Sequence, residues 1–173
     1  LPLTRWNVDP VMFIAQMTRD SLLPVNDGPM ITPLSSQAHD SGVIIGPLSS
    51  QAHVADMLAL TTLVYPHYFR PRTIEMGRYF GIYDGDTLAA MAGERMRFGD
   101  YQEISAICTH PNYTGRGYAQ RLTATLTNDI LGSGRHPILH VSHQNTRAKS
   151  LYQRMGFRFR AEIPLLAAKR VAK

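Results

Sequence analysis

Three short strand-like runs lie in the middle of the chain, joined by turns of only two or three residues. The first run ends at Asp84-Gly85, a dipeptide typical of tight hairpins, and the second ends at Gly99-Asp100. Turns this short join antiparallel neighbours, because a parallel connection needs a dozen or more residues. The sequence therefore predicts an antiparallel meander of three strands, at residues 79–83, 87–98 and 101–110.

The rest of the chain predicts helices and strands in alternation. Strict alternation in the third strand puts Ile104, Ala106 and Cys108 on one face. After the meander, helical spacing of apolar residues predicts helices at 118–131 and 145–155. Strand-like runs predict a strand at 137–142 and another from 157. Before the meander, a strand at 43–45 and a helix at 55–64 are expected. This order predicts an α/β or α+β domain with a mixed sheet.

The chain's size and composition favour one intracellular domain. It has 173 residues, and its single cysteine, Cys108, excludes an internal disulfide and a zinc site built on several cysteines. No apolar run approaches the length of a membrane helix, and residues 1–5 do not resemble a signal peptide. We expect a soluble cytoplasmic protein. Residues 1–41 predict no clear structure, and the repeated segment Pro-Leu-Ser-Ser-Gln-Ala-His at 33–39 and 47–53 reads as a local duplication.

The net charge of +5 is unevenly distributed. Residues 1–113 carry seven Lys and Arg against eleven Asp and Glu, whereas residues 114–173 carry eleven against two. A basic C-terminal third suits nucleic acid or a compact polyphosphate ligand. The basic residues are spaced singly, without the basic run of a nucleic-acid-binding arm, which favours the polyphosphate.

A loop with two glycines separates the third strand of the meander from the following helix. It reads Thr114-Gly115-Arg116-Gly117-Tyr118-Ala119. Glycines let the backbone turn tightly, and the amides at a helix start attract phosphate. The residues that define a dinucleotide-binding or nucleoside-triphosphate loop are absent.

Residues 145–157 carry a second pattern. Asn145, Ala148 and Tyr152 share one face of the predicted helix, which Gly156 ends before Phe157. Taken singly, Asn145 reads as a helix N-cap and Tyr152 as a core aromatic residue.

Together, the two stretches resemble the GNAT superfamily of N-acetyltransferases. The loop matches the family pattern Gln/Arg-x-x-Gly-x-Gly/Ala, with Thr114 replacing the usual first residue, and the helix matches Asn-x-x-Ala-x-x-Leu-Tyr-x-x-x-Gly-Phe. The stretch from Glu103 to Pro111 is closest to the FR47-like subgroup. The resemblance covers residues 78–165 well and 54–77 loosely. It implies a GNAT domain over 42–173 with two parallel strands that splay apart.

The resemblance also implies a cofactor site for acetyl-CoA, used as a co-substrate. The pantetheine arm would lie in the splay, against the backbone of 107–109, and Asn145 would bond to it. The pyrophosphate would sit on the loop amides, with charge from Arg116 and Arg121. The implied cofactor-binding residues are Ile107, Cys108, Thr109, Thr114, Gly115, Arg116, Gly117, Tyr118, Ala119 and Asn145.

Two residues are candidates for the chemistry that the resemblance implies. Tyr152 would act as general acid for the leaving thiolate, and Glu103 would deprotonate the amine acceptor directly or through water. Glu94 and Glu75 are the other candidate bases, and a solvated strand end is an equally good interpretation of Glu103. No metal is expected, because His140 and His143 do not share a face.

The sequence thus predicts an enzyme that moves an acetyl group directly from acetyl-CoA to a primary amine in a ternary complex. The alternatives are a non-catalytic acyl-CoA-binding or sensing module and, less favoured, a nucleic-acid-binding domain. The acceptor, a small molecule or a peptide, is not specified by any motif, and no membrane partner is expected. A homodimer is the commonest state for soluble proteins, but the sequence does not decide it.

Overall fold

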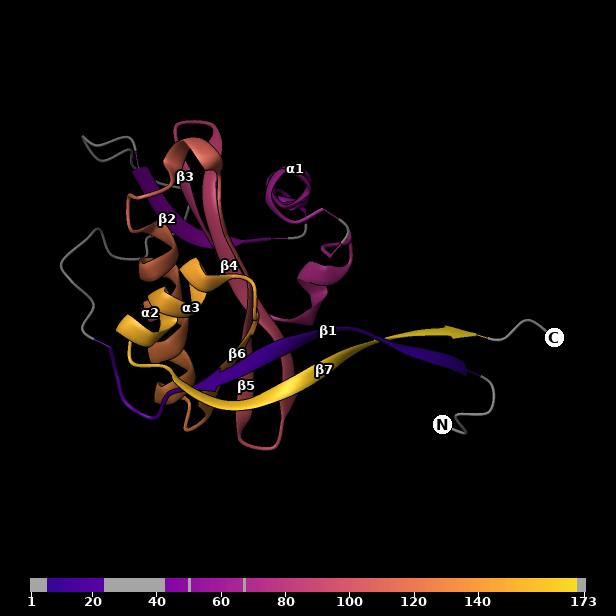
Figure 1. The fold of residues 1–173 in the computed structure, drawn as a ribbon. Coiled ribbons are helices and arrows are strands. Elements are labelled where there is room, and N and C mark those ends of the chain that lie inside the picture. Colours follow the sequence, from indigo (N-terminus) through magenta and orange to yellow (C-terminus); the bar gives the residue numbers. More distant parts are fainter. Residues whose placement is uncertain (1–5, 24–42, 50, 67, 171–173) are drawn as a thin grey trace. The chain divides into compact units, whose positions relative to one another are not determined.

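The computed structural model describes the whole chain except residues 1–5, 24–42, 50, 67 and 171–173 (Figure 1). The chain forms two compact units. One comprises residues 20–138, and the other combines residues 1–19 with 139–173. The first copy of the repeated segment, at 33–39, lies outside the described residues. The domain boundary at residue 42 stays a prediction.

The larger unit contains the predicted meander. Strands β3 (Tyr79–Asp84), β4 (Thr87–Phe98) and β5 (Tyr101–Thr109) pair antiparallel, and β2 (Val43–Leu48) pairs antiparallel with β3. Gly85 and Gly99 turn the chain between these strands in the left-handed conformation, at φ +58° and +52°. Glycine adopts that conformation without the steric cost of a Cβ. Both turns that the sequence predicts are therefore confirmed.

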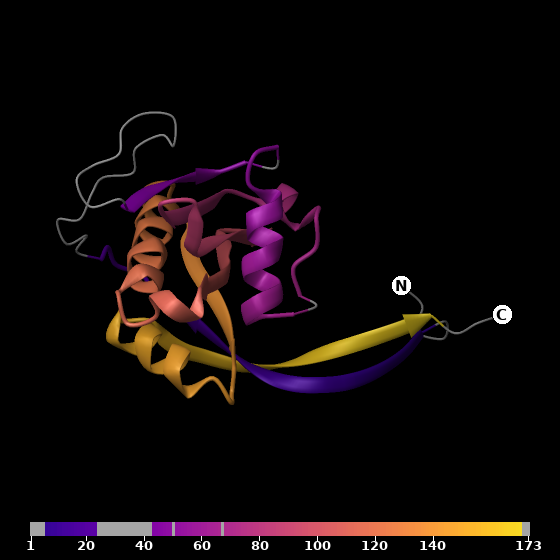
Figure 2. The same ribbon diagram turned by 90° about the horizontal axis from the view of Figure 1, so that it is seen from above.

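Two helices of this unit cover opposite faces of its sheet (Figures 1 and 2). Helix α1 (Val54–Val64) contributes Met57 and Leu60 to a core that also contains Tyr79, Met91 and Cys108. Helix α2 (Tyr118–Gly132) packs on β4 and β5 and buries residues at helical spacing, among them Leu122, Leu126 and Ile130. We call the two sides of the sheet the α1 face and the α2 face.

Strand β6 (His136–Ser142) begins beside the start of β5. The His136 amide donates to the Asp100 carbonyl at 2.7 Å, and the His136 and Tyr101 rings lie 5.6 Å apart. Because both strands start at the same place and α2 connects them, they begin as a parallel pair. This parallel start beside antiparallel strands gives the mixed sheet that the sequence predicts.

The expected alternation along β5 is wrong. Met91 pairs with Cys108 and Gly93 pairs with Ser105, so Ala106 and Ile107 together oppose one residue of β4. Ala106 has φ +52°, a conformation that non-glycine residues rarely adopt. This β-bulge reverses the alternation, so that Ile104 and Cys108 lie on opposite faces of the sheet.

The smaller unit contains a long antiparallel ribbon. Strand β1 (Trp6–Thr18) pairs with β7 (Arg158–Arg170), and helix α3 (Thr146–Arg154) precedes β7. The sequence predicted neither β1 nor the C-terminal half of β7. Pro10 and Pro164 have no amide hydrogen to donate, so each argues against a strand. A register shift next to Pro10 accommodates that proline within β1.

A buried amide connects three strands of the smaller unit. The Gln16 side chain of β1 lies 3.0 Å from the His140 ring of β6, between Nε2 atoms, and accepts from Arg160 Nη1 of β7 at 2.5 Å. Gln16 is only 6% exposed. A buried amide needs partners, and both are supplied here by neighbouring strands.

The described residues form seven strands and three α-helices, which confirms the α+β class. The short 3-10 helices η2 (Thr73–Met76) and η3 (Pro111–Tyr113) complete the elements. Within the described part of the chain, no helix is both long and apolar enough to span a membrane.

Replacing Gly93 by alanine tests the packing of the meander. A methyl group at Gly93 would overlap the ring of Tyr79, its cross-strand partner, which is fully buried. We expect Gly93→Ala to lower the free energy of unfolding by about 1–3 kcal/mol, the usual cost of overpacking. The control is Gly132→Ala, because a methyl group there would meet no atom within 4 Å. Urea melts in which the two variants have equal midpoints would contradict this packing.

The reactivity of Cys108 tests the core on the α1 face. Burial raises the pKa of this thiol to about 12, although a hydrogen bond from the Met91 backbone opposes the shift. The thiolate is the reactive form, so we expect a disulfide reagent at pH 8 to label the native protein at least ~100-fold more slowly than the urea-unfolded protein. Equal labelling rates in the two states would show that Cys108 is not buried.

Candidate functional site

The loop between β5 and α2 turns at two glycines. Gly115 and Gly117 have φ +84° and +77°, in the left-handed region where a Cβ is unfavourable. Apart from its chain neighbours, a methyl group built on either glycine would meet no atom of the described residues within 4 Å. The loop therefore needs glycine for its conformation and leaves open space in front of both residues.

Helix α2 begins without a side-chain cap. Gly117 is the N-cap, and the first helical hydrogen bond runs from the Arg121 amide to the Gly117 carbonyl at 3.0 Å. The amides of residues 118–120 precede that bond and are the unpaired donors of a helix start. Within the described residues no side chain caps them, and the first turn carries no acidic residue. This end of the helix has the positive potential that favours an anion.

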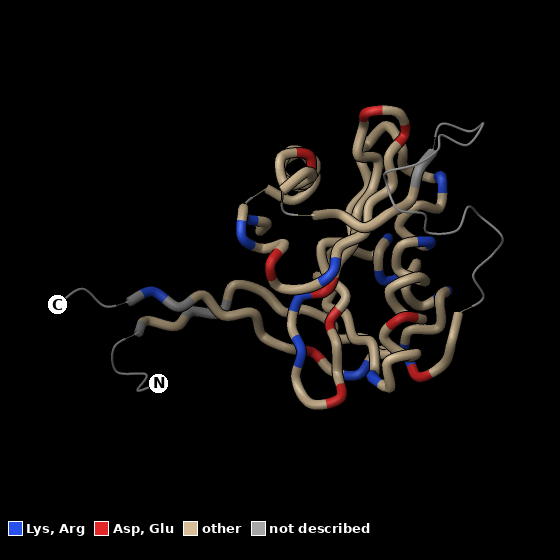
Figure 3. The backbone as a smooth tube through the Cα atoms, turned by 180° about the vertical axis from the view of Figure 1, so that it is seen from behind, with Lys and Arg blue, Asp and Glu red and all other residues tan. Residues whose placement is uncertain are grey.

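Arg116 is fixed beside the loop. Its guanidinium lies 4.7 Å from the centre of the Tyr113 ring and 3.3 Å from an Asp84 oxygen. A side-chain hydrogen bond with Tyr118 raises the pKa of Arg116, and the nearby Asp84 charge adds to the effect. Asp84 is the last residue of β3, beside the β3–β4 turn, an acidic part of the chain in Figure 3. Arg116 is thus in the loop as expected, with part of its charge already balanced.

Thr114, which replaces the usual first residue of the family pattern, forms hydrogen bonds within its own loop. Its hydroxyl donates to the Pro111 carbonyl at 3.1 Å, and its amide approaches the same oxygen at 3.4 Å. The Thr114 side chain thus connects the loop to η3. The next residue is Gly115, with its left-handed backbone.

The β5 bulge lies among the predicted pantetheine-binding residues. Ile107 forms part of the bulge, and Cys108 and Thr109 follow it. A bulge interrupts the regular ladder of backbone hydrogen bonds and redirects the neighbouring side chains. The Cys108 thiol points into the core of the α1 face, so only its backbone is available to a ligand.

Glu103 is almost fully buried under an arginine. It is 1% exposed, and its carboxylate accepts from Arg95 Nε at 2.9 Å and from Arg95 Nη2 at 2.6 Å. A second bulge, in β4, places Arg95 and Met96 opposite Glu103. Glu103 is therefore not the solvated strand end that the sequence left open.

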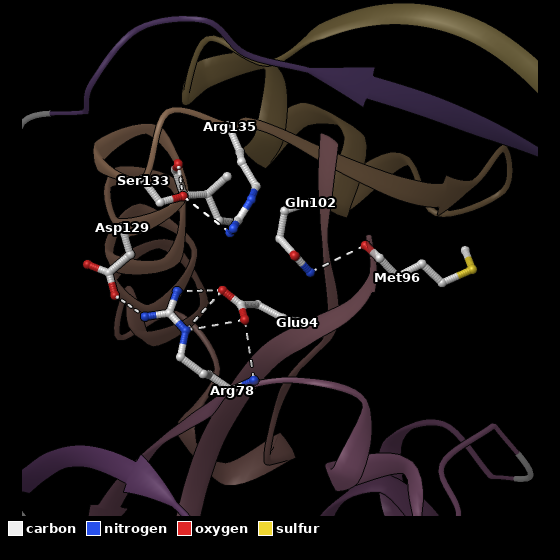
Figure 4. A network of polar contacts seen from close by, with 8 residues as sticks. Arg78, Glu94, Met96, Gln102, Asp129, Ser133 and Arg135 are labelled. Atoms are coloured by element: carbon white, nitrogen blue, oxygen red, sulfur yellow. Dashed lines mark hydrogen bonds and ion pairs between the residues drawn. The ribbon is translucent and has the colours of Figure 1, made fainter. Parts of the chain in front are cut away.

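The other two candidate bases are also paired with arginine. Glu94 binds Arg78 at 2.5 Å, and Arg78 reaches Asp129 of α2 at 3.1 Å, so this network belongs to the α2 face (Figure 4). Exposed Glu75 binds Arg72 at 2.9 Å, and that hydrogen bond lowers the pKa of Glu75. Glu94 and Glu103 lie on opposite faces of the sheet, because Glu94 pairs with Ile104.

The residues predicted on the second motif lie in the smaller unit. Asn145 is the N-cap of α3, and its side-chain oxygen accepts from the Ala148 amide at 3.0 Å. Tyr152 is buried, and its ring contacts Phe157 at 6.2 Å between centres. The N-cap and core interpretations of these two residues are thus both confirmed, and their roles toward a cofactor stay predictions.

His140 and His143 each contact another side chain of the smaller unit. His140 bonds to Gln16, and His143 Nε2 lies 3.0 Å from Glu162. Among the described residues, no group of three His, Cys, Asp or Glu side chains is placed to hold a metal ion.

Arg95, the two bulges and the absence of a side-chain cap on α2 are the features that sequence reasoning missed. Arg95 does carry a weak signal, since it belongs to the strand predicted to return beside the strand of Glu103. The bulges carry no such signal, because alanine gives no hint of a left-handed backbone.

Comparisons with known proteins agree with this geometry. The model of the FR47-like protein family matches residues 79–164. A solved structure from Novosphingobium aromaticivorans, described as an acetyltransferase of the GNAT family, is 32% identical with a TM-score of 0.76, and the match covers 98% of this chain and 70% of that one. No curated protein matches the sequence.

More distant structures show the same fold. The GCN5-related N-acetyltransferase from Kribbella flavida is 17% identical with a TM-score of 0.60, over 92% of this chain and 59% of that one. The ribosomal-protein-S18-alanine N-acetyltransferase from Escherichia coli is 17% identical with a TM-score of 0.61, over 76% of this chain and 96% of that one. The predicted GNAT fold is therefore confirmed, and the chain belongs to the GNAT superfamily of acetyltransferases, with an FR47-like segment at its centre.

Proposed function

We propose that the chain is an N-acetyltransferase that moves the acetyl group of acetyl-CoA directly to a primary amine. The observation that carries this proposal is the start of α2, where uncapped amides follow two left-handed glycines with open space in front of them. In a member of the GNAT superfamily, that arrangement suits the pyrophosphate of a CoA thioester. Acyl transfer in general follows from the family.

The residues present fit this cofactor. The amides of 115–119 would hold the pyrophosphate, with Arg116 beside them and Arg121 on the first turn of α2. The backbone of Ile107 and Thr109 would pair with the pantetheine arm, and Asn145 would contribute a side-chain hydrogen bond. Bound acetyl-CoA supplies an activated acyl group, so the protein needs no nucleophile of its own. Buried Cys108 could not act as one.

Two proton transfers remain for side chains. The attacking amine must lose a proton, and Glu103 would receive it through water, since its own carboxylate is buried and paired with Arg95. The departing thiolate must gain a proton, which we assign to the Tyr152 hydroxyl. Direct attack requires the amine and acetyl-CoA to be bound together, which gives a ternary complex.

One observation favours a second function, that of a non-catalytic acyl-CoA-binding or sensing module. All three candidate bases, Glu75, Glu94 and Glu103, are in ion pairs with arginines. Such a module would bind acetyl-CoA tightly and release no CoA with any amine. An assay of CoA-thiol release over a panel of amines separates the two functions.

Substitution of Gly117 tests the cofactor site. Gly117→Ala places a methyl group in the space that we assign to the pyrophosphate, so we expect acetyl-CoA to bind at least ~10-fold more weakly in calorimetry, a loss of about 1.4 kcal/mol.

Gly134→Ala is the matched control. Gly134 follows the other end of α2, has φ +76°, and also has no atom within 4 Å of a built methyl group. Both variants should lose similar stability, on the order of 1–2 kcal/mol, because the backbone strain is the same. Equal acetyl-CoA affinity in the two variants would contradict the assignment.

Substitution of Tyr152 tests the general acid. Tyr152→Phe keeps the buried ring against Phe157 and removes only the hydroxyl. We expect kcat to fall about 100-fold, a typical loss for a general acid, with acetyl-CoA affinity nearly unchanged. Tyr101→Phe, at the start of β5, serves as the control and should keep the wild-type kcat. An unchanged kcat in Tyr152→Phe at saturating substrates would exclude this role.

A further inference from the structure

The Arg95–Glu103 pair uses only one edge of the guanidinium. Nε and Nη2 of Arg95 hold the two carboxylate oxygens at 2.9 and 2.6 Å. Glu103 is buried, whereas the Arg95 side chain is 38% exposed. The group that this ion pair presents to an incoming molecule is therefore the arginine and not the carboxylate.

The second edge of Arg95 is open. Nη1 makes no hydrogen bond or ion pair with any residue that the structure describes. Guanidinium is planar, so Nη1 and the second hydrogen of Nη2 form another fork, which matches a carboxylate in two parallel hydrogen bonds. Because Glu103 already fixes the plane of the group, a ligand would lose little side-chain entropy in binding it.

Among the described residues, Arg95 forms an ion pair with Glu103 alone. Tyr79 lies on the same face and is close enough to both charged groups to feel them, and burial raises the pKa of its hydroxyl to about 12. Its phenol is therefore neutral at physiological pH, and it donates to the Thr73 carbonyl at 3.4 Å. Of the two charged groups in this ion pair, Arg95 is the one exposed to solvent.

A positive group beside the proposed base creates a problem for a simple amine acceptor. Amines bind as ammonium ions before they lose a proton, and Arg95 would repel that charge. An acceptor that carries a carboxylate close to its amine would instead place the carboxylate on Arg95 and its amine nearby. The buried Glu103 charge would then offset the ammonium.

We propose that the acceptor is a carboxylate-bearing amine of the amino-acid type, and that the open edge of Arg95 binds its carboxylate. This inference rests on the proposed function. It makes Arg95 a specificity-determining residue, while the same side chain positions Glu103.

The test compares amino acids with their own amides as acceptors, with CoA-thiol release as the readout. In the wild-type protein we expect kcat/KM for the acid to exceed that for the amide by about 10- to 100-fold, the range of one charge-assisted bidentate contact. The amide has the more acidic ammonium group, so its amine is more readily deprotonated. A preference for the acid would therefore have to come from binding.

Variants then identify the residue responsible. Arg95→Met should reduce the ratio to near 1, mainly by raising KM for the acid, and Arg95→Lys, which keeps the charge without the fork, should give an intermediate ratio. Arg97→Met is the matched control, because Arg97 is an exposed arginine two residues further along β4. It should keep the wild-type ratio.

The outcomes separate the two proposals. Equal turnover of acids and amides by the wild type would overturn the inference and leave the acetyltransferase in place, even if Arg95→Met failed to fold. An acid preference that stays at the wild-type ratio in folded Arg95→Met or Arg95→Lys would do the same. Absence of CoA release with every amine would overturn the proposed function and, with it, the inference.

Discussion

The site depends on the left-handed backbone at Gly115 and Gly117. These two residues let β5 end and α2 begin within one short loop, and among the described residues no side chain caps the first amides of α2. An ordinary N-cap side chain would have filled that position and neutralised the helix start. The free protein lacks the stabilisation of about 1 kcal/mol that such a cap would provide. A bound anion would stabilise this helix start by more.

Much of the larger unit could be predicted from the sequence, because its signals are local. Asp84-Gly85 and Gly99-Asp100 determine the hairpins, and apolar spacing determines α2. The glycine loop was predictable for the same reason, since its chemistry is contained in six consecutive residues. Strand β1 was not, because Pro10 argues against a strand and its partner β7 is about 150 residues away in sequence.

The ion pairs of Glu94 and Glu103 were equally hidden, since each joins residues on neighbouring parts of the sheet, whereas Glu75 pairs locally with Arg72. Glu103 looked like a free acid in sequence, and only the β4 bulge brings Arg95 over it. That single contact changes the chemistry expected of the site. In the proposed site, it would keep the carboxylate from direct contact with an acceptor and would present the Arg95 guanidinium instead. The β5 bulge was hidden from the sequence as well, and it places the Cys108 side chain in the core of the α1 face.

In the proposed site, the amides at the start of α2 bind the pyrophosphate of CoA. The most direct measurement is a titration of the ¹⁵N-labelled protein with CoA, followed by amide chemical shifts. We expect the amides of residues 115–119 to shift most, and inorganic pyrophosphate to shift the same amides at higher concentration. Shifts confined to other residues, or no shifts at saturating CoA, would contradict it.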